Sequence, residues 1–388
     1  MVTVSGPWTR EEMEQFLDAE TVPLRLGCRT PADKPWMLSL WYRFVDGAFE
    51  CATGADAAVV DYLERIFFAN MDIEGKETTE AEARARSQEL AKRRAPGLME
   101  EYEEIGGSPL YDHATTQATM LADELERRGY DVNTYYGMQY TEPFITDAVE
   151  QARTDGVDHL VGLPIYPLCG PSTNVQSLDE LDAALDEVGW DVPVDGLTGW
   201  HKHPGYTRCR IDNIRAFLDE NDLSLGDGTQ LVFSAHGTPQ YYLDEGSRYE
   251  EYVEEFCGVV ATALDAPDYA LGYQNHENRD VEWTDPDVEE VIESIEADRV
   301  VVEPVSFMHE QSETLSELDV ELREDAEAAG LEFYRVPIPY DDTRFAGALA
   351  DLVEPFVAGY DPSYAGLQQC LCRDEPGTMC LNAAHHDE

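Results

Sequence analysis

Strand-like apolar runs alternate with amphipathic helical segments over the last two thirds of the chain. The strand-like runs occupy residues 131–138, 159–167, 192–200, 230–236, 269–274, 299–307 and 331–338. Helical spacing follows most of them, as in SLDELDAAL and SETLSELDVELREDAEAA. This alternation predicts parallel sheets with helices on both faces, and two successive arrays predict two α/β lobes with a cleft between them. Ligands of such lobes bind at the carboxyl ends of the strands.

The first 60 residues have a different pattern. Helical spacing at 8–19 precedes three β segments, VPLRLGCRT, PWMLSLWYRF and GAFECAT, and a helix is predicted from about Asp56. A charged helical stretch follows at 76–104. The order of helix, meander and helix resembles the first half of the flavin-binding split barrel of the pyridoxamine-phosphate-oxidase-like family. Half a barrel leaves open strand edges, which favour a homodimer or packing on the next domain. FMN is not expected, because it needs a complete barrel.

The charge of the chain limits its expected partners. The 388 residues include 80 Asp and Glu against 26 Lys and Arg, which gives a net charge of −54. Proteins bind nucleic acids and anionic membranes through Lys and Arg, so neither is an expected partner. The acids are spread over every segment. This is typical of a halophilic protein in high salt, where a Debye length of about 3 Å at 1 M screens self-repulsion.

The sequence predicts a cytoplasmic protein. No run approaches the roughly 20 apolar residues that span a membrane, and the N-terminus lacks a signal pattern. Disulfides are therefore not expected. Four scattered cysteines are predicted to be buried small hydrophobes: Cys28, Cys51, Cys209 and Cys257. Three others, Cys370, Cys372 and Cys380, cluster near the end of the chain and need another explanation.

His236 lies at the end of an apolar run, in LVFSAHGTP. A histidine at the carboxyl end of a strand is a structural residue, a metal ligand or a proton acceptor, since the side chain titrates near neutrality. Glu313, Glu317 and Glu321 have i, i+4, i+8 spacing, which places them on one helix face. Carboxylate oxygens suit a metal that must be handed over. A chain with 80 acids also forms such ladders on solvated faces.

Five motifs resemble the ferrochelatase family. They are FSAHGTP with EGSRY downstream, EEYEEIGGSPL, YYGMQYTEPFITDAV, YALGYQ followed by a Trp, and VEPVSFMHEQSETLSELDVELRE. The resemblance implies two Rossmann-like chelatase lobes, at 61–225 and 226–360, between an N-terminal segment at 1–60 and a tail at 361–388. It also implies haem biosynthesis by insertion of Fe²⁺, the metal substrate, into a porphyrin, either protoporphyrin IX or coproporphyrin III.

The resemblance implies roles for four of these residues. Metal insertion must remove two pyrrole protons and deliver Fe²⁺. His236 matches the family's metal-site or proton-accepting histidine, and Glu313 matches a glutamate that faces it across the porphyrin site. Which of the two takes the proton stays open. Glu317 and Glu321 extend the set of candidate metal ligands, although a solvated acidic face is the simpler interpretation for these two.

Other residues match the family less closely. Ser108 and Gln117 match positions that hold porphyrin propionates, in a segment one residue shorter than the family pattern. Tyr136 and Trp283 are expected in the wall of the cleft, although such aromatic residues more often lie in a core. His201 and His203, in GWHKHPGY, are expected to be exposed loop histidines.

The tail contains the motif CLCRDEPGTMC. Close thiolates in a reducing cytosol indicate a metal or iron–sulfur site rather than a disulfide. Cys370, Cys372 and Cys380 are one ligand short of a four-thiolate site, so a fourth is expected from elsewhere. Several ferrochelatases hold a [2Fe–2S] cluster by three C-terminal cysteines and one upstream, and this resemblance implies that Cys169 is the fourth ligand. A zinc-binding tail and a tail of unused thiols are the alternatives.

The chain departs from the family at its start. The family opens with a strand and a Gly–Pro turn before the helix that begins near DYLERIF, and neither is present here. Either residues 38–44 or 48–53 substitute for this strand, or the first lobe lacks it. One alternative function is therefore a catalytically impaired porphyrin- or haem-binding protein. Another is a cobalt or nickel chelatase for a different tetrapyrrole, against which the cysteine tail argues.

Overall fold

The computed structural model of the chain describes residues 24–29, 35–45, 48–52, 55–70, 79–275 and 281–382. The chain divides into two compact units. The first comprises Met1–Met71 and Glu77–Glu100, and the second comprises Asp72–Lys76 and Glu101–Glu388. Among the described residues, no helix has both the length and the apolar character that crossing a bilayer requires.

The first unit contains an antiparallel meander. Strands β1 (Leu24–Arg29), β2 (Pro35–Val45) and β3 (Ala48–Ala52) pair in sequence order. Helix α2 (Ala55–Ala69) follows, and then α3 (Glu80–Glu104). The three β segments and these two helices are where the sequence pattern predicts them, whereas the helix predicted at 8–19 lies outside the described residues.

One lobe of the second unit is built on a parallel sheet of order β7-β6-β8-β9. Its strands are β6 (Thr229–His236), β7 (Tyr269–Gln274), β8 (Arg299–Pro304) and β9 (Glu332–Arg335). Alternate residues of β6 enter different cores: Leu231 and Phe233 pack on one side, and Val232 packs on the other. Because both faces are covered, the middle of the strand, residues 231–233, is apolar on both sides, as in buried parallel strands.

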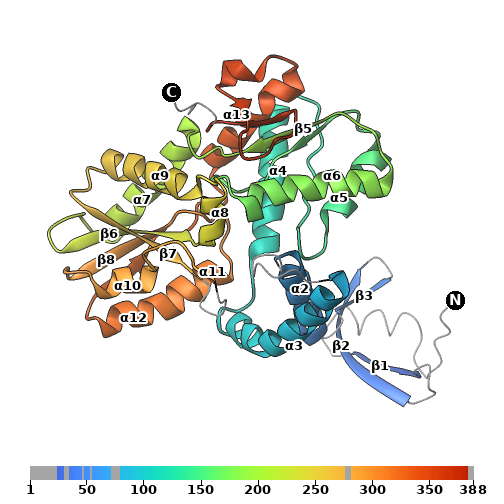
Figure 1. Cartoon of the computed structure of the whole chain (residues 1–388), viewed down its shortest axis with the longest axis horizontal. Coiled ribbons are helices and arrows are strands. Elements are labelled where there is room, and N and C mark those ends of the chain that lie inside the picture. The colour runs from blue at the N-terminus through green and yellow to red at the C-terminus, as the bar shows by residue number, and fades with distance from the viewer. Residues whose placement is uncertain are drawn as a thin grey trace. The chain divides into compact units, whose positions relative to one another are not determined.

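Helices cover both faces of this sheet (Figure 1). On one side lie α7 (Pro204–Glu220), α9 (Tyr249–Ala263) and α13 (Thr343–Ala358). On the other lie α10 (Val288–Glu293), the π-helix η3 (Glu317–Leu322) and α12 (Arg323–Ala328). Two short helices, α8 (Gln240–Asp244) and α11 (Ser312–Leu315), follow the carboxyl ends of β6 and β8.

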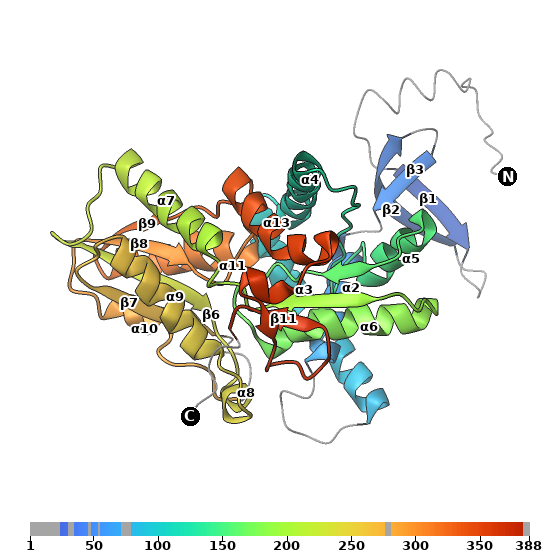
Figure 2. The same ribbon diagram turned by 90° about the horizontal axis from the view of Figure 1, so that it is seen from above.

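The other lobe has a sheet of order β10-β11-β5-β4. Strands β4 (Leu160–Gly162) and β5 (Val194–Thr198) are parallel. The C-terminal segment adds β11 (Thr378–Cys380), parallel to β5, and β10 (Gln368–Gln369), antiparallel to β11 (Figure 2). Residues 368–380 thus extend the sheet that β4 and β5 form.

Four helical segments are associated with this sheet. They are α4 (Leu110–Arg128), α5 (Ile145–Asp155), α6 (Gln176–Val188) and the π-helix η2 (Pro171–Val175). Val149 of α5 and Leu185 of α6 form a small core with residues of β4 and β5. A short 3-10 helix, η4 (Pro362–Ala365), joins α13 to β10.

The prediction of a strand at residues 131–138 is wrong. Within this stretch the structure has only an isolated bridge between Met138 and Phe144. A strand needs a paired neighbour, and here the backbone lies against the first turn of α5 instead. A Cβ on Gly137 would be 2.6 Å from the Cα of Ile145. Glycine is therefore required for this close approach.

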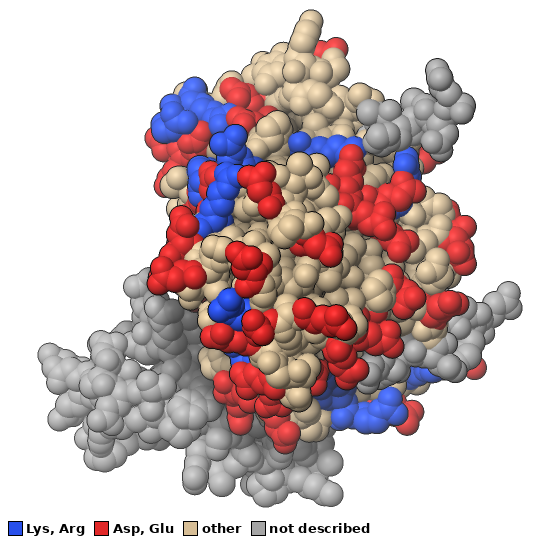
Figure 3. All heavy atoms as spheres, turned by 90° about the vertical axis from the view of Figure 1, so that its left-hand side faces the viewer, with Lys and Arg blue, Asp and Glu red and all other residues tan. Residues whose placement is uncertain are grey.

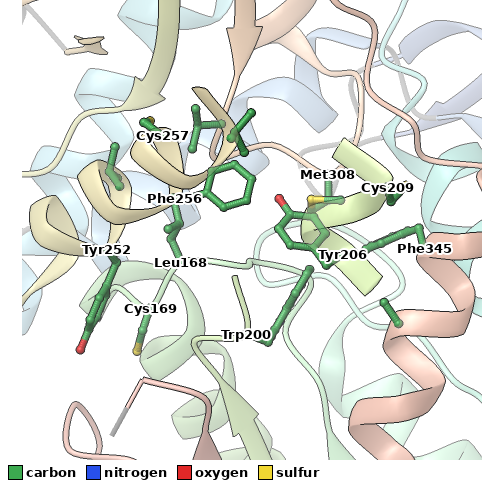
Figure 4. Packing of buried hydrophobic residues seen from close by; sticks show 14 of the residues in the cluster. Leu168, Cys169, Trp200, Tyr206, Cys209, Tyr252, Phe256, Cys257, Met308 and Phe345 are labelled. Carbon is green, nitrogen blue, oxygen red and sulfur yellow. The ribbon is translucent and has the colours of Figure 1, made fainter. Parts of the chain in front are cut away.

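An aromatic cluster joins the two lobes of the second unit. Trp200 follows β5, Tyr206 and Phe256 lie on α7 and α9, and Phe345 lies on α13 (Figure 4). The ring centroids of Trp200 and Tyr206 are 5.0 Å apart, and those of Tyr206 and Phe256 are 5.5 Å apart. Edge-on and offset packing at such distances is favourable beyond the area it buries. A single core therefore fixes one lobe against the other.

Acidic side chains are spread over the surface, with fewer basic ones among them (Figure 3). Basic residues are commonly paired with acids: Arg344, for example, lies 2.7 Å from Asp212 and also contacts Asp342. Exposed pairs of this kind add little stability on their own. Because the 80 acidic residues outnumber the 26 basic ones, the chain keeps an excess of negative charge.

Candidate active site and cysteine cluster

His236 is the last residue of β6, and its backbone is held on both sides. Its N–H donates to Ser306 Oγ at 3.0 Å, and the Tyr249 hydroxyl donates to its carbonyl at 2.9 Å. Tyr249 and Ser306 are themselves hydrogen-bonded at 2.8 Å. The ring Nδ1 lies 2.6 Å from the Gly237 carbonyl, which can only accept. In the neutral ring the proton is therefore on Nδ1, and Nε2 is the basic nitrogen.

Gln274 links the neighbourhood of His236 to the acidic helix. It is the last residue of β7 and the register partner of His236. Its Oε1 accepts from the Ser234 hydroxyl at 2.8 Å. Its Nε2 donates to Glu317 Oε2 and to the Glu313 carbonyl, both at 2.9 Å. The histidine and the first two glutamates are thus attached to adjacent strand ends.

The acidic segment does not form one regular α-helix. Glu313 lies in α11, whereas Glu317 begins the π-helix η3. The N–H of Glu321 bonds to the carbonyl of Ser316, five residues back, at 3.0 Å. Such wide turns often mark functional sites. The side chain of Glu321 is exposed, and its charge is close enough to raise the pKa of Glu317.

The carboxyl of Glu317 holds its proton unusually tightly. Burial raises its pKa to about 8, and the charge of Glu313 adds to the effect. The hydrogen bond from Gln274 opposes the shift, since it favours the ionised form. Without a cation, this carboxyl is therefore mostly protonated at neutral pH, and an arriving cation would replace the proton.

Glu317→Gln is expected to stabilise the metal-free protein at high pH but not at low pH. The folded pKa of about 8 exceeds the unfolded value of 4.5, so ionisation of the unfolded chain costs stability as pH rises from about 4.5 to 8. The loss has a slope of up to about 1.4 kcal/mol per pH unit. Thermal unfolding should show the variant gaining a few degrees over wild type at pH 8.5 and little at pH 5.

The exposed Glu324→Gln variant, which also removes one carboxylate, controls for net charge. An equal gain in both variants at pH 8.5 would attribute the effect to general charge repulsion and not to the burial of Glu317.

The two predicted propionate ligands lie in different environments. Gln117 on α4 is buried, and its Nε2 donates to the Met308 carbonyl at 2.8 Å. Ser108 is exposed, and its Oγ accepts from the Leu110 N–H at 3.4 Å. Gln117 therefore supports the loop that follows β8, whereas Ser108 is accessible to a ligand.

The two predicted wall aromatics are also separate in the structure. Tyr136 packs edge-on against Tyr111, with ring centroids 5.7 Å apart, and both line a cavity of about 640 Å³. Trp283 forms a backbone bridge with Pro239, just beyond the end of β6. Trp283 thus lies near the carboxyl end of β6, where His236 is also found.

The expectation that His201 and His203 are exposed is wrong. His201 is only 2% exposed, and its Nε2 lies 3.5 Å from a Glu255 carboxylate oxygen. His203 caps the N-terminus of α7 by accepting from the Tyr206 N–H at 3.4 Å. The loop turns inward because the N–H of His201 donates to the Pro167 carbonyl. Neither histidine belongs to the group around His236.

The structure brings the predicted cysteines together. The sulfur atoms of Cys169, Cys370 and Cys372 all lie within 4.8 Å of one another. Cys380 lies on β11, and its thiol is hydrogen-bonded with that of Cys370. The pairing of β11 with β5 carries the tail to Cys169, which no local pattern in the tail could indicate.

The surroundings of these four thiols favour the ionised form at one position. Hydrogen bonds from Cys169 and Cys372 lower the pKa of Cys370, and the same contact with Cys370 raises that of Cys169. The Thr198 hydroxyl also donates to Cys370 Sγ at 3.1 Å. Three of the cysteines are buried and Cys372 is exposed. Three sulfur atoms lie close together, and Cys380 contacts one of them; sulfur donors of this kind bind zinc and iron–sulfur clusters.

The sequence reasoning did not identify the supporting residues Gln274, Ser306 and Tyr249. Gln274 ends the motif YALGYQ, directly at a strand end, and this position was the available signal. Tyr249 lies in EGSRY just after His236, and its contact with Ser306 joins segments 57 residues apart. No local sequence pattern predicts such a contact.

Comparison with known proteins identifies the family. The family model for ferrochelatase matches residues 53–356. A ferrochelatase of Picosynechococcus sp. is 39% identical over 273 residues, which cover 67% of this chain and 69% of that protein. One of Thermosynechococcus vestitus is 37% identical over 293 residues, or 72% and 74% of the two chains. Among solved structures, SirB from Bacillus subtilis with Fe³⁺ covers 66% of this chain and 95% of its own, with 11% identity and a TM-score of 0.48. On the family model and these relatives, the chain belongs to the ferrochelatase family.

Proposed function

We propose that this protein inserts Fe²⁺ into a porphyrin, protoporphyrin IX or coproporphyrin III. The observation that carries the proposal is the position of Gln274, which pairs in register with His236 and donates from its side chain to the Glu317 carboxylate and the Glu313 backbone carbonyl. A proton acceptor and two carboxylates are then available at one edge of a parallel sheet, where ligands of such folds bind.

The reaction needs a base and a set of ligands that bind Fe²⁺ weakly enough to pass it to the porphyrin. Two pyrrole nitrogens lose their protons while Fe²⁺ forms bonds to all four nitrogens. We assign to Nε2 of His236 the acceptance of these protons one at a time, with release of the first to solvent before the second is taken, since Nδ1 is engaged with the Gly237 carbonyl. Glu313 and Glu317 would carry the metal, because hard carboxylate oxygens hold Fe²⁺ without a soft, tight site. A Glu317 carboxyl that exchanges a proton for a cation would release the metal as readily as it takes it up.

The test is anaerobic incubation of the protein with Fe²⁺ and either porphyrin, followed by the loss of porphyrin fluorescence. Turnover with one of the two supports the proposal and names the substrate. Tight porphyrin binding without turnover would instead indicate the catalytically impaired porphyrin-binding protein. Turnover with Co²⁺ or Ni²⁺ and another tetrapyrrole, but not with Fe²⁺, would indicate the alternative chelatase.

We also propose that Cys169, Cys370, Cys372 and Cys380 hold a [2Fe–2S] cluster. Three close sulfur donors, a fourth thiol in contact with Cys370 and one thiol inclined to ionise fit this group. A bound cluster of this type supplies a one-electron redox centre. The protein's own contribution is to hold the tail against β5, so that ligands about 200 residues apart in sequence meet.

The protein as isolated distinguishes a cluster from zinc. Visible absorption with equal amounts of iron and acid-labile sulfide supports the cluster. A colourless protein that contains zinc would replace the cluster by a structural zinc site with the same ligands.

A further inference from the structure

A buried ion pair lies next to the loop that leaves β8 and contacts the backbone of His236. Arg210 of α7 is 1% exposed and Glu303 of β8 is 0% exposed. The arginine Nε donates to Glu303 Oε1 at 2.8 Å, and Nη2 contacts the same oxygen. Burying two charges is costly, and apolar residues of similar volume usually serve a core at least as well. The stability of the fold therefore does not explain why a charged pair is found here.

The remaining donors of Arg210 hold the loop that leaves β8. Nη2 donates to the Pro304 carbonyl, and Nη1 donates to the Phe307 carbonyl at 3.1 Å. These two carbonyls flank Val305 and Ser306. A planar guanidinium with several fixed donors can hold two backbone carbonyls and a carboxylate at once, which an ammonium cannot do with the same geometry. Glu303 orients the guanidinium, and the guanidinium orients the loop.

The loop in turn holds the histidine. Ser306 Oγ accepts the N–H of His236 at 3.0 Å and is bonded to the Tyr249 hydroxyl at 2.8 Å. The N–H of Val305 donates to the Ser234 carbonyl at 2.8 Å, two residues before His236. A continuous set of hydrogen bonds thus runs from the ion pair through residues 304–307 to the backbone of the proton acceptor.

We propose that Arg210 and Glu303 are positioning residues for His236. They touch neither substrate nor metal; they fix the loop that sets the orientation of the histidine backbone, and so the direction in which Nε2 points. This inference rests on the proposed function, since it assigns the pair a role through His236. A misplacement of about 1 Å at a reacting group can cost up to 10²-fold in rate, which is the size of effect that such a device prevents.

The test is the double variant Arg210→Met/Glu303→Leu, assayed for Fe²⁺ insertion. The apolar pair should fold with a Tm at or above that of wild type, because no charge is left unpaired. We expect kcat to fall about tenfold while the KM for the porphyrin is unchanged, since only the chemistry depends on the histidine. Loss of a different charged pair, Arg128→Met/Glu354→Leu, which joins α4 to α13, should leave kcat unchanged.

Ser306→Ala tests the same route without touching the ion pair. It should lower kcat by itself and add little to the double variant, because both changes break one chain of contacts. Wild-type kcat in either the double variant or Ser306→Ala would overturn the inference. If the double variant failed to fold, Ser306→Ala alone would decide. A wild type without turnover would overturn the proposed function, and the inference with it, whereas the outcomes above bear on the inference alone.

Discussion

His236→Ala is expected to lower kcat for Fe²⁺ insertion by about 10²–10⁴-fold, the usual contribution of a positioned general base. The two pyrrole protons must leave before the metal can bind all four nitrogens. In this structure Nε2 is the basic atom of the ring, because Nδ1 faces the Gly237 carbonyl. Anaerobic loss of porphyrin fluorescence measures the rate, and quenching on titration measures porphyrin binding, which should be largely retained.

His159→Ala provides the matched control. His159 immediately precedes β4 at its amino end, in contact with Asp195 at 2.8 Å, and is therefore at the opposite end of its strand from the ligand-binding edge. Its variant should insert iron at the wild-type rate. Turnover in His236→Ala equal to that of wild type would remove His236 from the chemistry and leave the carboxylates as the candidate bases.

The parallel lobe of the second unit was predictable because its strands are buried on both faces. Strands β6 and β8 contain the continuous apolar runs LVF and VVV, which the fold requires when helices cover both sides. The helices between them carry one apolar face each, and the alternation alone identifies a parallel sheet. The same reasoning placed His236 and Glu313 after strand ends, and hence on one edge of the sheet.

The other lobe was less predictable because part of its sheet comes from distant sequence. The run 131–138 has strand-like composition, yet the structure gives it no ladder, since composition does not supply a neighbour. Conversely, β10 and β11 are two and three residues long, too short for any periodic signal. The pairing of β11 with β5 depends on a tertiary contact. The four cysteines indicate this contact only indirectly, because ligands of one site must meet.

Residues that support the site were missed for a related reason. Arg210 has the spacing of an ordinary helix residue, and Glu303 interrupts an apolar strand as one of 80 acids. In so acidic a chain a buried carboxylate cannot be distinguished from the solvated majority by sequence. The π-turn at Glu317 was hidden as well, because its residues also fit an α-helical pattern. Both features lie where the structure departs from regular geometry around the candidate site.

If the four cysteines hold the proposed [2Fe–2S] cluster, Cys370→Ser is expected to abolish the visible absorption and bound iron and to lower the Tm. The sulfur of Cys370 contacts those of Cys169, Cys372 and Cys380, and its N–H donates to the Thr378 carbonyl at 2.8 Å. Loss of this central ligand leaves three thiols that no longer surround a common position. Because metal binding stabilises the folded tail, amide hydrogen exchange should rise in β10 and β11 and not in β6.

A fall in Tm alone would not establish ligation, since any buried cysteine replaced by serine leaves a hydroxyl to satisfy. Cys257→Ser separates the two effects. Cys257 is fully buried in α9 and lies outside the group of four cysteines, so its variant carries the same chemical change without the same loss of ligand. We expect Cys257→Ser to keep its iron and its exchange protection in β10 and β11 even if its Tm falls. Retention of colour in Cys370→Ser, or its loss in Cys257→Ser, would contradict the assigned ligand set. Because β11 is held to β5 by backbone pairing as well, the tail of Cys370→Ser should exchange faster without being released from the sheet.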